Sequence, residues 1–216
     1  MNLKTIIFGA GGQGKVILDI LQLNNIEIAG FLDNKKAKKY PSFQNYPILG
    51  DLDYCRSNDS ILGKEFYGIV AIGSNQIREK ILKELVLMGM IPINAVHPSV
   101  IIAKDVKLGK GNMIAAGVII NPGTIIADNV ILNTSCSVDH DNLLEEHVQV
   151  CPGVNLAGEV TVKKSAFIGT GAIINPGVTI GEKSIIGSGS VVIKDIPDNV
   201  VVVGNPAKII RELFVE

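Results

Sequence analysis

The sequence has no tryptophan, few aromatic residues and only three cysteines. Cys55, Cys136 and Cys151 form no CxxC pair, and their odd number predicts reduced thiols in a cytoplasmic protein instead of a disulfide framework. The charge has no bias either, because 20 basic and 21 acidic side chains give a formal net charge of −1. We therefore expect neither a nucleic-acid-binding patch nor a charged tail.

Long apolar runs are also missing. No stretch reaches the roughly 18 residues that a membrane-spanning helix needs. The first residues, Met1-Asn2-Leu3-Lys4, lead directly into a predicted strand and do not have the pattern of a signal peptide. The chain has 216 residues, which is enough for two small domains.

Isoleucine, valine and glycine are abundant instead, and from about residue 100 to 193 they follow an exact period of six. Neither an α-helix nor a plain alternating strand has this period, whereas a hexapeptide repeat is typical of a parallel β-helix. Three hexads close one triangular coil, so sixteen hexads predict about five coils. A purely structural solenoid would show the same repeat. The aliphatic positions are Ile102, Leu108, Ile114, Ile120, Ile126, Leu132, Val138, Leu144, Val150, Leu156, Val162, Ile168, Ile174, Ile180, Ile186 and Val192.

The first 94 residues have a different pattern, in which strands alternate with helices. Strands are expected at Thr5–Phe8, at 27–32, at 67–72 and, as a short strand or connector, at 91–96. Helices are expected after the first strand and after the third, the latter ending near residue 88. The pattern predicts a small parallel sheet with ligand chemistry at its strand ends.

A glycine-rich turn follows the first strand, and its Gly9, Gly11 and Gly14 satisfy the G-x-G-x-x-G spacing. Asp33 ends the second strand, where its carboxylate could meet a ribose hydroxyl. Because 94 residues make only half of a dinucleotide fold, this turn suits the phosphates of a nucleotide sugar as well as NAD. Close strand–helix packing would also explain the glycines, and a simple turn would explain Asp33.

Chemistry in the repeat is concentrated around His140. An ordinary imidazole titrates near 6.5, so His140 can accept a proton at neutral pH. Eighteen residues make one coil, so Gly158 is expected directly above His140, where its N–H could donate to an oxyanion. His97 and His147 are expected to be solvated turn residues. The polar residues that replace small or apolar ones around His140 are Asn133, Thr134, Ser135, Asp139, Asp141 and Asn142.

The repeat stops after Lys194-Asp195-Ile196-Pro197. We expect a last strand at 200–203, then the segment Gly204-Asn205-Pro206-Ala207-Lys208, and a short closing helix at 209–213. The predicted domains are therefore 1–94, 95–196 and a C-terminal segment at 197–216.

Taken together, these features resemble nucleotide-sugar acetyltransferases of the bacillosamine N-acetyltransferase and sialic acid O-acetyltransferase type. The resemblance covers essentially the whole chain. It is carried by the glycine-rich turn, Phe31-Leu32-Asp33-Asn34, Tyr46-Pro47-Ile48-Leu49-Gly50, Gly73-Ser74-Asn75 with Arg78, His97-Pro98-Ser99, Asp139-His140-Asp141 and the segment at 204–208. It implies that a Rossmann-like domain precedes a left-handed β-helix, and that the protein is a homotrimer with active sites between neighbouring β-helices.

The resemblance also implies roles for individual residues. His140 would be the general base, Asp141 would orient its ring, and the Gly158 amide would contact the thioester oxygen. The implied nucleotide-sugar site contains Gly9, Gly11, Gly12, Gln13, Gly14, Asp33, Asn34, Gly73, Asn75 and Arg78. The implied acetyl-CoA site contains Gln149, Thr170, Gly187, Ser188, Pro206 and Lys208. Gln13 and Gln149 stand where relatives often have histidine, and no metal is expected.

The function predicted on this basis is acetyl-CoA-dependent N-acetylation of a UDP- or GDP-linked 4-amino-4,6-dideoxy sugar in a cytoplasmic enzyme of surface glycan biosynthesis. O-acetylation of a sialic acid or another sugar is an alternative, because the same base serves a hydroxyl. A non-catalytic nucleotide-sugar sensor is a second alternative. A metal-dependent β-helix enzyme would need three histidine ligands, and the chain has only three histidines in all.

Overall fold

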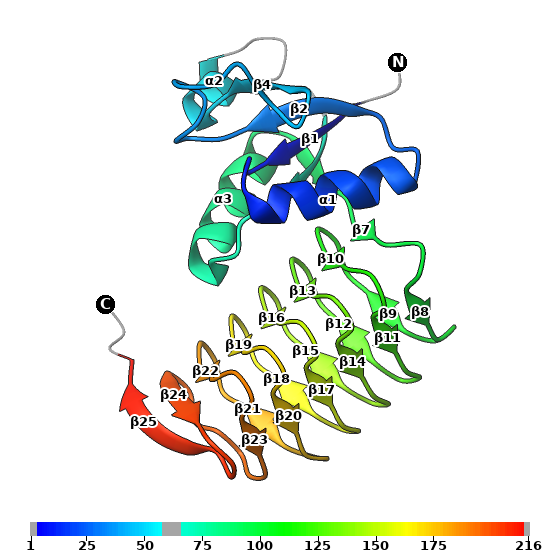
Figure 1. Ribbon diagram of the computed structural model, residues 1–216, viewed down its shortest axis with the longest axis vertical. Coiled ribbons are helices and arrows are strands. Elements are labelled where there is room, and N and C mark those ends of the chain that lie inside the picture. The colour runs from blue at the N-terminus through cyan, green and yellow to red at the C-terminus, as the bar shows by residue number, and fades with distance from the viewer. Residues whose placement is uncertain (1–3, 58–65, 214–216) are drawn as a thin grey trace. The chain divides into compact units, whose positions relative to one another are not determined.

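The computed structural model describes residues 4–57 and 66–213, and the chain divides into two compact units, Met1–Pro98 and Ser99–Glu216 (Figure 1). The predicted lack of a signal peptide concerns residues that lie partly outside this range. No helix within the described range is long and apolar enough to cross a membrane.

The first unit contains a six-stranded sheet in the order β3-β4-β2-β1-β5-β6. All neighbouring strands are parallel except β3 and β4, which form an antiparallel hairpin. The predicted parallel sheet is confirmed, whereas the hairpin and helix α2 were not anticipated. The strands are β1 (Thr5–Phe8), β2 (Ile28–Leu32), β3 (Ser42–Phe43), β4 (Tyr46–Gly50), β5 (Phe66–Val70) and β6 (Met90–Pro92), and a two-residue strand β7 (Ala95–Val96) follows.

Among the described residues of this unit, three helices form: α1 (Gly12–Leu23), α2 (Leu52–Ser57) and α3 (Asn75–Leu87). One apolar core joins alternate side chains of β1 with α2 and α3, because successive residues of a strand point to opposite faces. Ser74 caps α3 by accepting a hydrogen bond from the Ile77 N–H. Helix α1 begins at the glycine-rich turn, and Gly11 provides no capping side chain.

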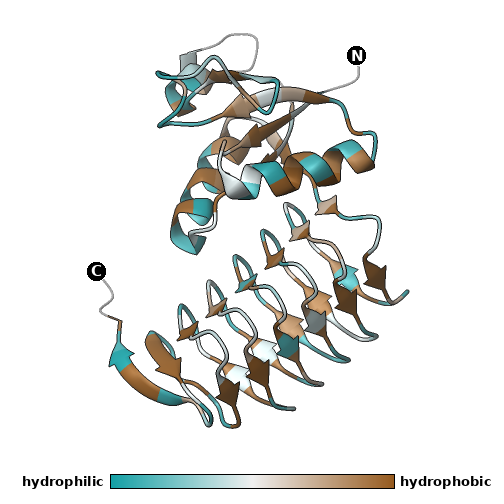
Figure 2. Cartoon of the chain, viewed as in Figure 1, coloured by the Kyte–Doolittle hydropathy of each residue, from teal (hydrophilic) through white to brown (hydrophobic). Residues whose placement is uncertain are grey.

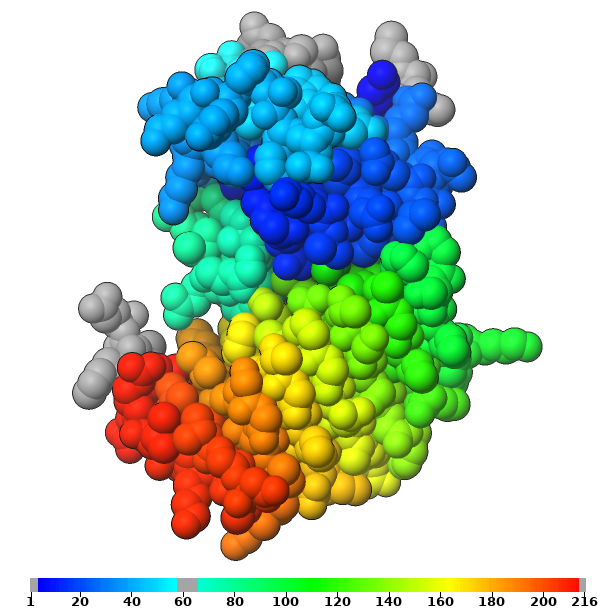
Figure 3. Space-filling view, in the orientation of Figure 1, coloured from blue at the N-terminus to red at the C-terminus, as the bar shows by residue number. Residues whose placement is uncertain are grey.

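The second unit is a left-handed parallel β-helix, built from sixteen two-residue strands as the repeat predicts. Figure 3 shows its successive coils as successive colour bands. The strands are β8 (Ile101–Ile102), β9 (Lys107–Leu108), β10 (Met113–Ile114), β11 (Ile119–Ile120), β12 (Ile125–Ile126), β13 (Ile131–Leu132), β14 (Ser137–Val138), β15 (Leu143–Leu144), β16 (Gln149–Val150), β17 (Asn155–Leu156), β18 (Thr161–Val162), β19 (Phe167–Ile168), β20 (Ile173–Ile174), β21 (Thr179–Ile180), β22 (Ile185–Ile186) and β23 (Val191–Val192).

From β8 to β20, each strand pairs in parallel with the strand eighteen residues later, so Val138 lies beside Leu156 and Ser137 beside Asn155. Three flat sheets result, and strands β14, β15 and β16 belong to the three different ones. The aliphatic residue of every hexad from Ile114 to Val192 is buried. Figure 2 accordingly shows mostly apolar strands and paler or polar turns. The exact period of six therefore arises from one inward aliphatic residue per side of the triangle.

The C-terminal segment corrects one prediction. Residues 209–213 were expected to form a short helix, but β25 (Lys208–Glu212) is a strand that pairs antiparallel with β24 (Val200–Val203). Strand β24 pairs in turn with β22 at the end of the coil stack. The open edge of β24 offers unpaired backbone groups, and the β-branched pair Ile209-Ile210 satisfies them more readily as a strand than as an isolated helical turn.

Candidate active site

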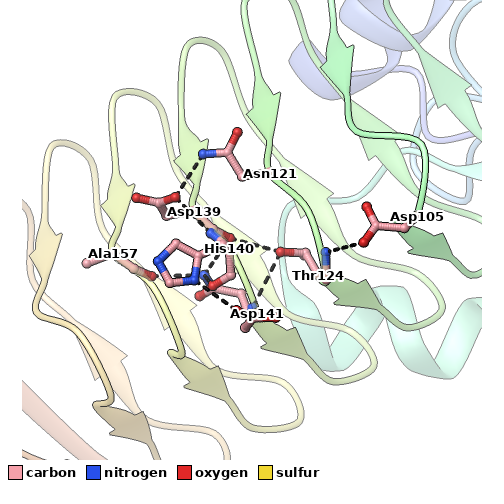
Figure 4. Close-up of polar contacts among 9 residues, drawn as sticks. Asp105, Asn121, Thr124, Asp139, His140, Asp141 and Ala157 are labelled. Carbon is pink, nitrogen blue, oxygen red and sulfur yellow. Dashed lines mark hydrogen bonds and ion pairs between the residues drawn. The ribbon is translucent and has the colours of Figure 1, made fainter.

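His140 lies in the turn between β14 and β15, and we call residues Asp139–Asn142 the His140 corner (Figure 4). Its Nδ1 is 2.9 Å from Oδ2 of Asp141. A carboxylate only accepts hydrogen bonds, so the neutral imidazole carries its proton on Nδ1 and presents the lone pair of Nε2. The side chain is 54% exposed, so the imidazole is open to solvent.

The charges around the imidazole favour its protonated form. The hydrogen bond to Asp141 is the main reason that the pKa of His140 is raised above its ordinary value, and the negative charges of Asp139, Asp141 and Glu159 add to it. The pKa of Asp139 is lowered, because its carboxylate accepts hydrogen bonds from the Asn121 side chain and the His140 N–H, both at 2.8 Å. The corner thus stabilises an imidazolium, as a general base requires after it takes a proton.

Two glycines leave room for these side chains. A Cβ on Gly158 would lie 2.5 Å from both Cε1 and Nε2 of His140, so the imidazole packs against this buried glycine. A Cβ on Gly123 would lie 2.2 Å from Oδ1 of Asp141. The predicted stacking of Gly158 with His140 is confirmed, and the Gly158 N–H donates to no group in the described part of the chain. Its role toward an oxyanion stays a prediction.

Two buried polar residues, Thr124 and Asn142, support the corner from inside the coil. Thr124 is fully buried, and Asn142 is 1% exposed. Sequence reasoning noted Asn142 only as one of several polar neighbours and missed Thr124. A signal was present, because the residues that occupy this inward position in successive coils are Val106, Thr124, Asn142, Val160 and Val178.

The predicted acetyl-CoA residues lie along another corner. The turns Pro152-Gly153, Thr170-Gly171 and Ser188-Gly189 stack one above the other, and we call them the glycine edge. A Cβ on Gly153, Gly171 or Gly189 would meet nothing within 4 Å. Gln149 precedes this edge, and its Nε2 lies 3.8 Å from Sγ of Cys151. An elongated ligand could therefore approach the backbone of several coils.

The β24–β25 hairpin extends the glycine edge. The Gly204 N–H donates to Oγ of Ser190 at 3.2 Å, and the Ala207 N–H donates to the Val191 carbonyl at 2.8 Å. This places the hairpin turn, with exposed Pro206 and Lys208, beside the Ser188-Gly189 turn. The structure thus gathers five of the six predicted acetyl-CoA residues along one edge, with Gln149 buried at its beginning.

In the first unit, the glycines of the turn divide into two kinds. A Cβ on Gly9 would lie 2.6 Å from the Ala71 carbonyl oxygen, and one on Gly14 would lie 2.2 Å from the Gly9 carbonyl oxygen. These two permit close strand–helix packing. Gly11 and Gly12 are exposed, and a Cβ on either would meet nothing within 4 Å. Only Gly11 and Gly12 therefore leave open space at the N-terminus of α1, where backbone N–H groups attract anions.

Asp33 and Asn34 are held within the same unit. The Asp33 carboxylate accepts hydrogen bonds from the backbone N–H groups of Ala10, Lys35 and Lys36, each at 2.9 Å. The Asn34 Oδ1 accepts one from the Leu52 N–H at 3.1 Å. Asp33 therefore ties the glycine-rich turn to the end of β2, and its contact with a nucleoside stays a prediction.

Arg78 supports the Gly73-Ser74-Asn75 turn from the interior of the first unit. It is 1% exposed, and its guanidinium donates to the carbonyls of Ile72 and Gly73 at 3.1 and 3.5 Å. Burial lowers its pKa to about 10. Asn75 is also buried, whereas Gly73 is exposed, and a Cβ on Gly73 would meet nothing within 4 Å. Arg78 thus shapes this turn from the interior, and Gly73 presents it to solvent.

Both units of the chain match known protein families. Residues 4–85 match the PglD N-terminal domain, and residues 159–194 match the bacterial transferase hexapeptide repeats. Over 96% of both chains, the sequence is 32% identical to the GDP-perosamine N-acetyltransferase of Escherichia coli O157:H7. The chain belongs to the PglD-type family of nucleotide-sugar acetyltransferases.

Two solved structures of the family have the same fold. PerB from Caulobacter crescentus, solved with CoA and GDP-perosamine, is 37% identical with a TM-score of 0.89, covering 97% of this chain and 98% of that one. The acetyltransferase domain of PglB from Neisseria gonorrhoeae, solved with acetyl coenzyme A, is 32% identical with a TM-score of 0.89, covering 97% and 100%. Members of this family are thus seen with both the acetyl donor and a nucleotide sugar.

His147 and the three cysteines are buried. His147 was expected to be a solvated turn residue, but it is 7% exposed and its Nδ1 is 2.8 Å from Nδ2 of Asn129. The reason is that the turn of an adjacent coil packs against it. Burial raises the pKa of Cys136 to about 12, and Cys55 and Cys151 are also buried free thiols. Among the described residues, no three His, Cys, Asp or Glu side chains gather as metal ligands would.

Proposed function

We propose that the protein transfers the acetyl group of acetyl-CoA to the amino group of a nucleotide-activated amino sugar. GDP-perosamine, the substrate named for the E. coli and C. crescentus relatives, is the first candidate. The observation that carries the proposal is the Asp139-His140-Asp141 corner, where a carboxylate holds Nδ1 of an exposed imidazole. We place the enzyme in the cytoplasm, which its three free thiols support.

His140 performs the proton transfers in this proposal. Acetyl-CoA supplies an acetyl group that is activated as a thioester. As the C–N bond forms, Nε2 of His140 accepts a proton from the sugar amine, and it returns a proton to the sulfur when the C–S bond breaks. Asp141 stabilises the imidazolium between these two events, and the Gly158 N–H would donate to the thioester oxygen as negative charge develops.

The glycine edge is the proposed acetyl-CoA site. Its open positions at Gly153, Gly171 and Gly189 let a long, narrow ligand approach backbone groups along several coils. Lys208 is exposed at the end of this edge and would pair with the phosphates of the coenzyme. Thr170, Gly187 and Ser188 supply polar groups between the two ends.

The nucleotide part of the sugar substrate is assigned to the first unit. Gly11 and Gly12 leave the N-terminus of α1 open to a diphosphate, and the adjacent Lys15 and Lys36 provide positive charge. Nζ of Lys36 also lies 4.5 Å from the ring centroid of Phe43. The turn at Gly73 is the remaining open element of this surface.

A homotrimer completes the proposal. Within one chain, the His140 corner lies at one end of the sheet that contains β14, and the glycine edge lies at its other end. Two neighbouring copies would bring one copy's base to the other copy's acetyl donor. The outward side chains of this sheet include the exposed residues Ile101, Ile119 and Ile173, which a neighbouring copy would cover.

The test is thiol release from acetyl-CoA, measured with GDP-perosamine, UDP-linked 4-amino-4,6-dideoxy sugars, CMP-sialic acid and free sialic acid. We expect turnover with one nucleotide amino sugar, an amide product by mass spectrometry, and a rate that falls in His140→Ala. Turnover with a sialic acid alone, giving an ester, would replace N-acetylation by O-acetylation. Binding of a nucleotide sugar without turnover of any acceptor would contradict the enzymatic proposal and favour a sensor.

A further inference from the structure

Asn142 occupies an inward position of the His140 corner. The residue at this position differs between successive coils. It is valine in three of the five coils, at positions 106, 160 and 178, but it is polar in Thr124 and Asn142. Val160 is fully buried, so a valine fits this position of the coil without difficulty. The two polar residues are consecutive in the stack, and one of them is in the His140 corner itself.

The Asn142 side chain contacts both peptide groups that flank His140. Its Nδ2 donates to the Asp139 carbonyl at 2.7 Å and lies 3.2 Å from the His140 carbonyl. Oγ1 of Thr124 also donates to the Asp139 carbonyl, at 2.9 Å, and accepts from the Asn142 N–H at 3.4 Å. Figure 4 shows Thr124 beside the corner, on the neighbouring coil. The backbone that carries the imidazole is therefore held from within by side-chain donors.

The same amide reaches the next coil. Nδ2 of Asn142 donates to the Ala157 carbonyl at 2.8 Å. This carbonyl belongs to the peptide group whose N–H is that of Gly158, the glycine that packs against the imidazole. Hydrogen bonds in such a chain polarise one another. One buried side chain thus connects the base to the predicted oxyanion donor.

This arrangement has a cost that packing alone does not explain. Oδ1 of Asn142 is buried, and it has no hydrogen-bond partner within the residues that the structure describes. A buried polar atom without a partner is destabilising, and valine would remove it. The fold alone accepts valine at this position. Asparagine is expected there if the reaction requires it.

We propose that Asn142, assisted by Thr124, is a positioning residue that sets the orientation of His140 and of the Gly158 amide. The inference rests on the proposed function, since it assigns these residues to the same acetyl transfer. It adds that the positions of the imidazole and the Gly158 amide depend on buried side chains inside the coil, as well as on the exposed carboxylates beside His140.

The test compares Asn142→Val with Asn112→Val. Asn112 is also a fully buried inward asparagine, but it lies at another corner, where its Oδ1 accepts from the Val130 N–H at 2.6 Å. We expect Asn142→Val to lower kcat roughly tenfold to hundredfold, as misplacement by about 1 Å can do. Both KM values should change little, and the melting temperature should fall, because valine removes the donor to the buried Asp139 and Ala157 carbonyls. Asn112→Val should keep kcat while it lowers the melting temperature.

A second measurement does not depend on turnover. The chain has only three histidines, so the ring signals of His140 can be assigned in NMR spectra by comparison with His140→Ala. In Asn142→Val the pKa of His140 should fall toward its ordinary value, because a displaced corner loosens the contact with Asp141. If wild-type protein acetylates no sugar, the proposed function fails while this titration still judges the positioning role.

Two outcomes would overturn the proposal. One is wild-type kcat and an unchanged His140 titration in Asn142→Val. The other is a loss of kcat in both Asn142→Val and Asn112→Val that is proportional to each variant's loss of stability. If Asn142→Val does not fold, the nearly isosteric Thr124→Val replaces it, since it removes the Oγ1 donor to Asp139. We expect Thr124→Val to lower kcat several-fold, and a wild-type rate in that folded variant would equally refute the role.

Discussion

Gly158→Ala tests the predicted catalytic geometry with the smallest possible change. The added Cβ would lie 2.5 Å from Cε1 and Nε2 of His140, whereas carbon atoms in contact normally lie about 3.5–4.0 Å apart. The imidazole must therefore move by about 1 Å or more. Gly158 is not among the glycines with a positive φ, so alanine fits the backbone without strain. The side chain of His140 is 54% exposed, and it can move without disrupting the core.

We expect kcat to fall roughly hundredfold, the effect of a misplacement of about 1 Å. Both KM values and the melting temperature should remain close to those of the wild type. Alanine keeps the N–H of residue 158, so the substitution separates the position of the ring from the proposed oxyanion contact. Steady-state kinetics with acetyl-CoA and the preferred nucleotide sugar provide the measurement.

A double variant supplies the control. If Gly158→Ala acts only by displacing the imidazole, it should cause little further loss in a His140→Ala background. An undiminished kcat in Gly158→Ala would refute the reasoning, since the reaction would then not depend on the ring position that the structure shows. A full additional loss in the double variant would mean that residue 158 acts independently of His140.

Three further predictions concern the His140 corner and the first unit. His140→Ala should lower kcat roughly 10²–10⁴-fold while acetyl-CoA binding, measured by calorimetry, is retained; a near wild-type rate would remove His140 from the reaction. Asp141→Asn should lower the raised pKa of His140. Because the base must be neutral to act, the acidic limb of the kcat/KM profile should then move to lower pH. An unmoved limb would contradict the pairing of His140 with Asp141. Asp33→Ala should lower the free energy of unfolding by about 1–3 kcal/mol, because three backbone N–H groups lose their acceptor, and an unchanged denaturant midpoint would disprove that role.

Much of the fold follows from the sequence alone. An exact period of six leaves few alternatives to a β-helix, because each side of a triangular coil must place one aliphatic residue inward. The eighteen-residue offset then stacks Gly158 on His140 without further information, as the structure confirms. The polar residues around His140 marked the candidate site because they interrupt a repeat of otherwise apolar and small residues.

Other features depended on the tertiary structure, because they arise from contacts that a linear pattern does not reveal. The sequence treats the glycines of the turn alike, but neighbouring backbone explains Gly9 and Gly14 and leaves Gly11 and Gly12 open. The closing segment became a strand because β24 presents an unpaired edge. The donors that hold the His140 corner, Thr124 and Asn142, became visible only where three carbonyls from two coils converge on one buried amide.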